Sequence, residues 1–465
     1  MQVYLYVKNF GKIKEAEINI SNYSIFVGNN NSGKTYMMQL IYGVMKHIRV
    51  SEDEYELLDV ILEPLLTSGK VTIDGNNISV LENSVNQYLA NHKEKIVYDI
   101  FQKRITIEQV EVRFVLDEEE CYDISYFTNE TNKEVGDLES FLEGLEHNKK
   151  FLMSHAKRQI YTIKVLKENQ LIVLGCYLVK LNVNQKIQNI MELLVDMLVD
   201  DGRNSEIFLP ASRTGLLLLY RNYFAKKTDA FVFERGKYNA DNKLGLTMPV
   251  YEFLRFLQTV NTDEEQIEVN RNLINFVEKH LIVGKIELNN IGSLVYIPSQ
   301  TEERLPLYLS SSMVNELTPI LEILMAEDKR RFIIYDEIET SLHPAKQVEM
   351  ARLLNRMNNA GYKLIVSTHS DTMATKLNNL FMLSFEEITE EQRQKKLDKL
   401  HLTKDDLLQN KNVHVYQFIN GEDGMTTVSE LEFRKTPYTG YDFSLFNDNA
   451  MNLFEESKVI MGMDE

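Results

Sequence analysis

This 465-residue chain has few cysteines, no long apolar run and no excess of positive charge. It has two cysteines, Cys121 and Cys176, and neither belongs to a CxxC pair, which excludes a zinc hook and a disulfide framework and fits a reducing compartment. No stretch approaches the roughly 18 apolar residues of a membrane-spanning helix. The N-terminal segment has charges scattered through it, unlike a signal peptide. We therefore expect a cytoplasmic protein with no membrane partner, for which a role in transport would require separate membrane subunits.

The charge balance is strongly acidic. The chain has 51 Lys and Arg against 69 Asp and Glu, a formal net charge of −18. An acidic surface repels phosphates, which excludes non-specific coating of nucleic acid but leaves a local basic groove open. The composition is 44% hydrophobic and 26% charged, which is typical of a globular protein. The length indicates two or three lobes.

A phosphate-binding loop is predicted between a strand and a helix. Tyr23–Val27 has the apolar pattern of a buried strand, and the segment from Lys34 to about His47 is helical in pattern. The junction matches G-x-x-x-x-G-K-[ST], in which backbone N–H groups surround the phosphates of ATP. The lysine reaches the β and γ phosphates, and the hydroxyl binds Mg²⁺. The predicted nucleotide ligands are Gly28, Asn29, Asn30, Asn31, Ser32, Gly33, Lys34 and Thr35, with Thr35 also a metal ligand.

Two later strands are predicted to end in chemically useful side chains. Phe332–Tyr335 is followed by Asp336 and Glu337. In a P-loop protein we expect Asp336 to hold the Mg²⁺ shell and Glu337 to polarise the attacking water. His369 follows the strand Lys363–Ser367, at the end where ligands bind in such sheets, and is predicted to contact the γ-phosphate and position the water. Glu339 has two open interpretations: a support of the metal shell, or a surface acid.

The order of these motifs resembles that of the ABC ATPases, in the ABC/SMC-like branch that includes RecF, the SMC proteins and the OLD-family ATPases. The resemblance covers residues 1–48 and 205–380. It implies an α/β fold, an ABC-type P-loop NTPase head with a mixed parallel sheet, an antiparallel β-lobe and a helical insertion. It also implies a self-partner: two copies packed head to tail as a homodimer or higher homo-oligomer, with two ATPs between them.

The same resemblance assigns a signature loop to Leu309–Glu316. Ser311 or Ser312 would touch the γ-phosphate held by the partner subunit. The family usually has a glycine where Met313 stands. The alternative interpretation of these serines is an ordinary helix N-cap.

Two shorter segments carry further resemblances. Ser341–Pro344 resembles the D-loop of the family, and Pro344 also fits a simple helix start. Leu209–Arg213 resembles a segment common in OLD-like ATPases. Arg213 then faces the nucleotide, faces the other lobe, or forms a structural salt bridge. No glutamine is assigned to a Q-loop.

The expected organisation has five consecutive segments. They are 1–50, the N-terminal ATPase part; 51–204, a β-rich insertion; 205–284, a helical arm or lid; 285–380, the C-terminal ATPase part; and 381–465, a C-terminal extension. The acids of this extension, such as Asp405–Asp406 and Glu422–Asp423, are interpreted as solvated surface, since they form no nuclease-like pair.

Three roles are compatible with such an ATPase. Stand-alone chains of this shape resemble the ATPase subunits of the bacterial anti-phage systems PARIS, Septu and Gabija, which implies a sensor or regulatory ATPase that controls a separate nuclease or toxin. The alternative is a RecF/SMC-like ATPase of DNA repair or recombination that binds nucleic acid. A third is a nucleotide-bound scaffold that hardly turns over, against which Glu337 and His369 argue.

Overall fold

The computed structural model describes residues 2–20, 22–49, 64, 68, 70–116, 122–128, 160–167, 170–178, 206–218, 245–288, 294–301, 303–328, 330–435, 439–443 and 454–461. The chain forms two compact units, one of residues 1–6, 45–93 and 109–204 and a larger one of residues 7–44, 94–108 and 205–465. The middle of the predicted helical arm, residues 219–244, lies outside the described part. Among the described helices, none is both long and apolar enough to cross a membrane.

The larger unit is built on a mixed sheet. Its strands run in the order β2 (Ile13–Asn19), β16 (Thr426–Leu431), β15 (Val413–Asn420), β3 (Tyr23–Gly28), β14 (Lys363–Ser367), β13 (Phe332–Tyr335) and β9 (Glu206–Leu209). From β15 to β9 all neighbours are parallel, whereas β15 and β16 form an antiparallel pair. The predicted mixed parallel sheet of an α/β fold is confirmed. Because parallel strands end at the same edge, this sheet brings the ends of β3, β13 and β14 together.

Both faces of this sheet are covered, as the continuous apolar character of its strands requires. Alternate residues such as Ile333 and Tyr335 of β13 belong to one core with α8 (Met248–Thr259), α11 (Ser312–Met325), α12 (Pro344–Asn359) and α13 (Asp371–Phe385). On the other face, the ring of Phe208 packs edge-on against Tyr42 of α1 (Lys34–His47). Helix α1 therefore begins where the P-loop ends and is anchored under the sheet.

The remaining elements of the larger unit are short. They are α9 (Glu264–Val269), α10 (Arg271–Phe276), the π-helix η3 (Val277–Ile282), the antiparallel strands β10 (Gly284–Leu288), β11 (Leu294–Pro298) and β12 (Leu305–Pro306), the 3₁₀ turns η4 (Leu307–Leu309) and η5 (Lys404–Asp406), and α14 (Glu390–Leu400). Strands β10 and β11 form an antiparallel hairpin.

The smaller unit contains an antiparallel sheet in the order β4 (Lys70–Ile73), β6 (Tyr122–Thr128), β7 (Ile160–Lys167) and β8 (Gln170–Leu178). It confirms the predicted antiparallel β-lobe. Most of the 27-residue helix α3 (Gly75–Phe101), up to residue 93, belongs to this unit. Its Asn86 side chain completes two backbone hydrogen bonds of Val112 in β5 (Gln109–Val115), at 2.9 and 2.7 Å. β5 is next to β1 (Gln2–Phe10) in the sheet order.

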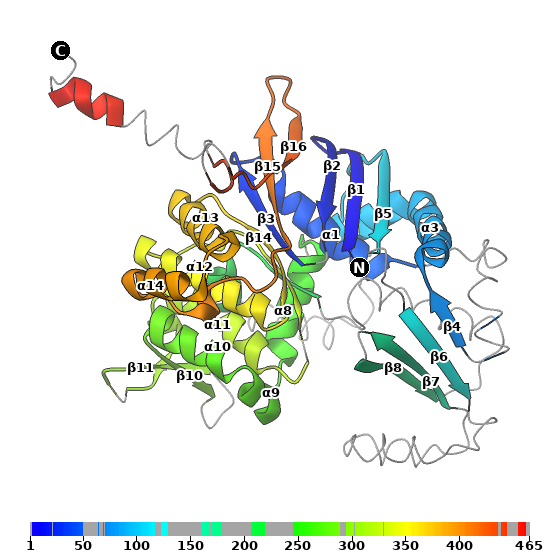
Figure 1. Cartoon of the computed structure of the whole chain (residues 1–465), viewed down its shortest axis with the longest axis horizontal. Helices are drawn as coiled ribbons and strands as arrows, with labels where there is room; N and C mark the ends of the chain where they lie inside the picture. The colour runs from blue at the N-terminus through cyan, green and yellow to red at the C-terminus, as the bar shows by residue number, and fades with distance from the viewer. Residues whose placement is uncertain are drawn as a thin grey trace, which may run out of the picture. The chain divides into compact units, whose positions relative to one another are not determined.

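The C-terminal part of the chain supplies two strands at the centre of the large sheet. Figure 1 shows the orange β15 beside the blue β3, and the register pairs Val413 with Tyr23 and Phe418 with Gly28. Residues 413–431 were expected in a C-terminal extension, but they complete the ATPase sheet instead. The apolar pattern of Val413–Ile419 predicts the strand correctly but does not identify its partner, because pairing between distant segments leaves no local signal.

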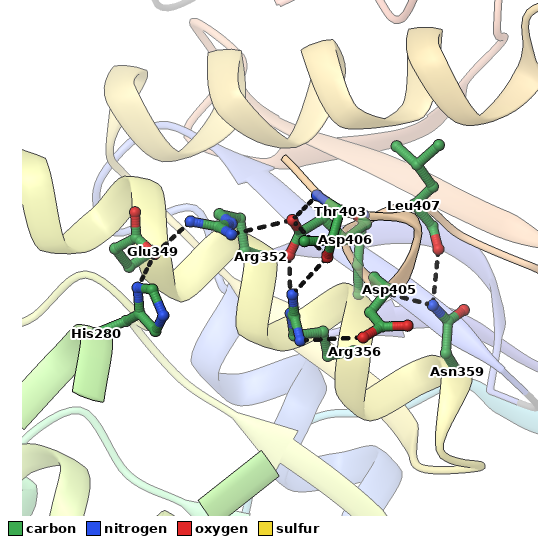
Figure 2. A network of polar contacts seen from close by, with 10 residues as sticks. His280, Glu349, Arg352, Arg356, Asn359, Thr403, Asp405, Asp406 and Leu407 are labelled. Carbon is green, nitrogen blue, oxygen red and sulfur yellow. Dashed lines mark hydrogen bonds and ion pairs between the residues drawn. The ribbon is translucent and has the colours of Figure 1, made fainter. Parts of the chain in front are cut away.

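A buried charge network fastens the segment before β15 to α12 (Figure 2). Asp406 is fully buried, and its two carboxylate oxygens accept hydrogen bonds from Arg352 at 3.0 Å and Arg356 at 2.8 Å. Burial alone would raise the pKa of Asp406, but the hydrogen bonds from the two guanidinium groups outweigh it and the pKa lies below its ordinary value. The expected solvated surface is therefore wrong for Asp406.

We expect Asp406→Asn to lower the free energy of unfolding by about 3–5 kcal/mol at neutral pH, because it removes the buried carboxylate that Arg352 and Arg356 share. The neighbouring change Asp405→Asn is the matched control. The Asp405 carboxylate is 73% exposed and 3.5 Å from Arg356, so its loss should cost under about 1 kcal/mol. Urea unfolding of the three chains measures both effects.

The difference in unfolding free energy between wild type and Asp406→Asn should depend on pH. Because the native pKa of Asp406 is depressed, its contribution is present above the ordinary carboxyl pKa and is lost as the pH falls through the native pKa. The stability gap between wild type and Asp406→Asn should therefore narrow in acid. A gap that is small at neutral pH or widens in acid would contradict this assignment.

Candidate functional site

The loop after β3 has the backbone of a phosphate-binding loop. Gly28, Asn31 and Gly33 have φ angles of 137°, 55° and 92°, which place three of its residues in the left-handed region. Such a backbone directs successive N–H groups to one side. The Lys34 ammonium lies within the loop and donates to Gly28 O at 3.1 Å and Asn29 O at 2.8 Å. Burial lowers the pKa of Lys34 to about 8, and a nearby phosphate would favour its charged form.

The loop is held from β15, a connection that the sequence does not signal. A Cβ on Gly28 would lie 2.1 Å from the backbone oxygen of Phe418, so only glycine fits there. Asn29 N donates to the same oxygen at 3.2 Å. Asn420 then donates from its side-chain amide to Asn30 O at 3.1 Å. Phe418 and Asn420, which come almost 400 residues after the P-loop in the sequence, thus fix the loop, and no local motif marks them.

Thr35 and Asp336 meet at the ends of α1 and β13. Thr35 Oγ1 donates to Asp336 Oδ2 at 2.8 Å, and Ser367 Oγ donates to Asp336 Oδ1 at 2.6 Å. Burial raises the pKa of Asp336, and the two hydroxyl donors counter that effect. A hydroxyl and a carboxylate side by side are hard oxygen ligands of the kind Mg²⁺ prefers. The donor set therefore fits the metal that the motif implies.

Glu337 follows Asp336 with φ of 47°, in the left-handed region. Its N–H donates to Ser367 Oγ at 2.8 Å, and Thr340 Oγ1 donates to its carboxylate at 3.4 Å. This backbone turn separates the two acids: Asp336 stays buried against Thr35, whereas Glu337 lines a cavity beside the P-loop.

His369 and Glu339 lie at the same cavity. The Glu339 carboxylate accepts the backbone N–H of His369 at 2.6 Å, so it orients the turn after β14. Burial lowers the pKa of the His369 imidazole and the Lys34 charge acts in the same direction, which favours the neutral ring. Burial raises the pKa of Glu339. Of its two interpretations, a surface acid is the poorer fit to this position.

One open cavity of about 960 Å³ is lined by most of the predicted P-loop residues, from Asn30 to Thr35, together with Glu337 and His369, whereas Asp336 lies behind its wall, in contact with Thr35. Its walls also include residues that sequence reasoning missed, from the β1–β2 turn and from the segment after α3. Tyr36 of α1 is a further lining residue that was missed, with 53% of its surface exposed and its ring stacked on Phe101. No glutamine is present among the described lining residues. The lining consists of Phe10, Gly11, Lys12, Ile13, Asn30, Asn31, Ser32, Gly33, Lys34, Thr35, Tyr36, Lys103, Arg104, Ile105, Thr106, Glu337, Glu339, Thr340 and His369.

The predicted signature serines are placed apart from this cavity, whose described lining does not include them. Ser311 is the N-cap of α11 and accepts the N–H of Val314 at 3.3 Å, which agrees with the capping interpretation. Ser312 is the first residue of the helix, and both serines are exposed. Met313 is partly buried against the core. The exposed serines are thus available to a second molecule.

Arg213 forms a buried salt bridge, as one of its three interpretations predicts. Its side chain is fully buried, and Nε lies 2.7 Å from Glu316 Oε2 of α11. Pro344 begins α12 after the N-cap His343, which agrees with the simple helix start.

A family model described as "AAA ATPase domain" matches residues 1–193 and 226–374. No curated protein matches. Three solved structures are similar in fold. An SMC head bound to the C-winged helix domain of ScpA is 12% identical, covers 93% of this chain and 98% of its own, and has a TM-score of 0.36; the SMC head domain from Thermotoga maritima is 13% identical, covers 93% and 100%, and has a TM-score of 0.31. The Smc head domain with an extended coiled coil bound to the C-terminal domain of ScpA, from Pyrococcus furiosus, is 14% identical, covers 98% of each chain and has a TM-score of 0.34. Because the matched ranges of the family model include well over half of the residues, the chain belongs to the AAA ATPase domain family.

Proposed function

We propose that this protein hydrolyses ATP at sites shared between two copies of itself. The observation that carries the proposal is the contact between Thr35 and Asp336, at 2.8 Å, next to the cavity that Lys34, Glu337 and His369 line. Hydroxyl, carboxylate, ammonium and imidazole groups from three separate segments, namely the start of α1 and the ends of β13 and β14, meet there. That set suits phosphate binding, metal binding and activation of water.

Each residue has a distinct part in the proposed reaction. Lys34 and the P-loop N–H groups bind the phosphates, and Thr35 with Asp336 holds Mg²⁺. When bound, Mg²⁺ neutralises charge on the phosphate oxygens. Glu337 accepts a hydrogen bond from the attacking water and draws off its proton. His369, neutral near physiological pH, hydrogen-bonds the γ-phosphate and fixes the line of attack.

The second copy supplies the predicted signature loop, which carries Ser311 and Ser312 and is called the serine loop below. Ser311 and Ser312 are exposed at the positively polarised start of a 14-residue helix, a favourable position for an anion. They do not line their own chain's described cavity. In a head-to-tail dimer they would face the γ-phosphate held by the partner subunit, which is the arrangement that the resemblance to ABC/SMC-like ATPases implies.

Mixing two defective chains tests the shared site. Lys34→Met disables the P-loop but leaves the serine loop, whereas Ser312→Arg disables the serine loop but leaves the P-loop and acids. We expect each chain alone to have little Mg²⁺-dependent ATP hydrolysis. Mixed heterodimers contain one site made only of wild-type parts, so activity should return. If Ser312→Arg alone stays fully active, or if mixing restores nothing, the sites are not shared.

The proposed biological role is the sensor or regulatory ATPase of an anti-phage defence system. Two acids of the C-terminal part are engaged within the ATPase itself: Asp406 is neutralised by two arginines, and Asp423 pairs with Lys14 at 2.7 Å. Because these acids are engaged in ion pairs, we assign the effector to a separate nuclease or toxin. A gene for such an effector beside this one, and loss of phage resistance on Glu337→Gln, would support this role.

The alternative role is DNA repair or recombination of the RecF/SMC type. ATP hydrolysis stimulated by DNA ends, together with a replication or repair operon, would favour it over defence. Hydrolysis unaffected by DNA and responsive to a partner protein would favour defence.

A further inference from the structure

Arg213 lies at the junction of β9, β13 and α11, and it is fully buried. Nη1 donates to the backbone oxygens of Pro210 and Asp336, both at 2.7 Å. Nη2 donates to the backbone oxygen of Glu337 at 3.1 Å. The guanidinium carbon also lies 4.5 Å from the ring centroid of Tyr335. A planar guanidinium satisfies several acceptors at once, which the single ammonium of lysine does not.

Two of these acceptors belong to the proposed metal ligand and the proposed catalytic acid. Glu337 has φ of 47°, a left-handed conformation that is strained for a non-glycine residue and therefore has to be held by its surroundings. Its N–H is held by Ser367 Oγ, and its carbonyl is held by Arg213. The guanidinium thus fixes the backbone turn from which the Glu337 side chain enters the cavity.

The other side of Arg213 reaches the helix that carries the serine loop. Nε lies 2.7 Å from Glu316 Oε2, and the adjacent Thr214 donates to Glu316 Oε1 from its N–H at 3.0 Å and from its hydroxyl at 2.7 Å. The Thr214 hydroxyl is also 3.3 Å from the backbone oxygen of Ser312. Glu316 Oε1 therefore accepts two hydrogen bonds from Thr214, and Oε2 is in ion-pair contact with Arg213, within about one turn of Ser312.

We propose that the Arg213–Thr214–Glu316 cluster is a coupling element between the two halves of the catalytic machinery in one chain. It joins the backbone of Asp336 and Glu337, which act on the ATP of their own chain, to the start of α11, whose serines act on the ATP of the partner. The proposal rests on the proposed shared-site function. A shift of either part changes a buried ion pair in a low-dielectric setting, so the other part must follow or the pair is broken. Arg213 is a positioning residue in this scheme.

Arg213→Lys is the primary test, because it keeps the buried charge opposite Glu316 but cannot bind all of the carbonyl groups. We expect a folded chain whose ATP affinity changes within about twofold and whose kcat falls roughly 10- to 100-fold, the size of a misplaced catalytic group. A structural defect of the whole pocket would instead reduce affinity and kcat together. Should Arg213→Lys fail to fold, Thr214→Val is the second variant, with a smaller fall in kcat in the same direction.

Two mixtures separate coupling from local support of the acids. When Arg213→Lys is mixed with Lys34→Met, the intact P-loop and acids lie on the Arg213→Lys chain, which reports the effect on its own acids. In the second mixture, one chain carries both Lys34→Met and Arg213→Lys, and the other carries Ser312→Arg. The competent site then takes its P-loop and acids from the Ser312→Arg chain and its serine loop from the chain with Arg213→Lys. Coupling predicts lower activity in both mixtures than in the reference mixture of Lys34→Met and Ser312→Arg. A loss confined to the first mixture would overturn the proposal.

Hydrogen exchange gives a readout that does not depend on mixing. In the Glu337→Gln chain, Mg-ATP should change exchange at the amides of residues 312–316, and adding Arg213→Lys should abolish that change while ATP still binds. An unchanged response in the double variant overturns the coupling element. If the reference mixture shows no recovery but the exchange response depends on Arg213, then the shared-site function fails while the coupling within one chain stands.

Discussion

Glu337→Gln is expected to reduce ATP turnover by roughly 100-fold or more while leaving ATP binding intact, since general-base groups contribute about that much. The three acids after β13 have different surroundings. Both carboxylate oxygens of Asp336 are engaged by hydroxyl groups, and Glu339 accepts the N–H of His369. Among the described residues, the Glu337 carboxylate accepts only a long hydrogen bond from Thr340, at 3.4 Å, and Glu337 lines the cavity. Glu337 is therefore the acid best placed to accept a proton from water.

Glu339→Gln is the comparison variant for this experiment. Its amide oxygen can still accept the N–H of His369, so we expect a smaller fall in turnover than for Glu337→Gln. Single-turnover hydrolysis and nucleotide binding should be measured on both chains with Mg-ATP. With binding intact and hydrolysis blocked, Glu337→Gln should also accumulate as an ATP-bound dimer, because a ligand that binds the dimer interface stabilises it by mass action. Turnover at the wild-type rate in Glu337→Gln would refute the catalytic assignment.

The chemical side chains of this site follow local patterns, which is why the sequence predicts where they lie. Each follows an apolar run short enough to be a buried strand, and parallel strands end at one edge. The helix predicted from Lys34 to about His47 agrees with α1, and the strand predicted at Phe332–Tyr335 agrees with β13. The meeting of Thr35 with Asp336 then follows from topology, without any signal between the two residues.

The supports of the site are set by long-range pairing and could not be predicted. Phe418 and Asn420 hold the P-loop from a strand whose pattern shows only that it is buried. Asp406 is an acid in a polar segment, and its burial depends on two arginines about 50 residues earlier. The functions of these residues depend on which segments become neighbours. A single sequence gives no information on that point, because the local pattern is the same whichever partner a strand or a carboxylate finds.

Lys34→Met is expected to weaken ATP binding by about 10- to 100-fold, which corresponds to the loss of one charge-assisted hydrogen bond of about 1.5–3 kcal/mol. Methionine keeps most of the buried stem and removes only the ammonium. Lys14→Met is the control, because Lys14 lies on β2 outside the P-loop and pairs with Asp423 at 2.7 Å. Calorimetric titration with Mg-ATP compares the three chains.

The structure supplies a second measurement that separates binding from damage to the loop. Lys34 also donates to Gly28 O and Asn29 O, so Lys34→Met leaves these carbonyl groups without that partner even before ATP is added. The melting temperature without nucleotide reports this loss alone. The rise in melting temperature with Mg-ATP reports affinity, since stabilisation grows with the logarithm of ligand concentration over Kd. We expect the melting temperature without nucleotide to fall modestly. The rise in melting temperature with Mg-ATP should be almost completely lost at ATP concentrations that saturate wild type. A Lys34→Met chain that melts lower but keeps the full nucleotide-dependent rise would show that the ammonium stabilises the loop without binding phosphate, and the nucleotide would then have to bind elsewhere.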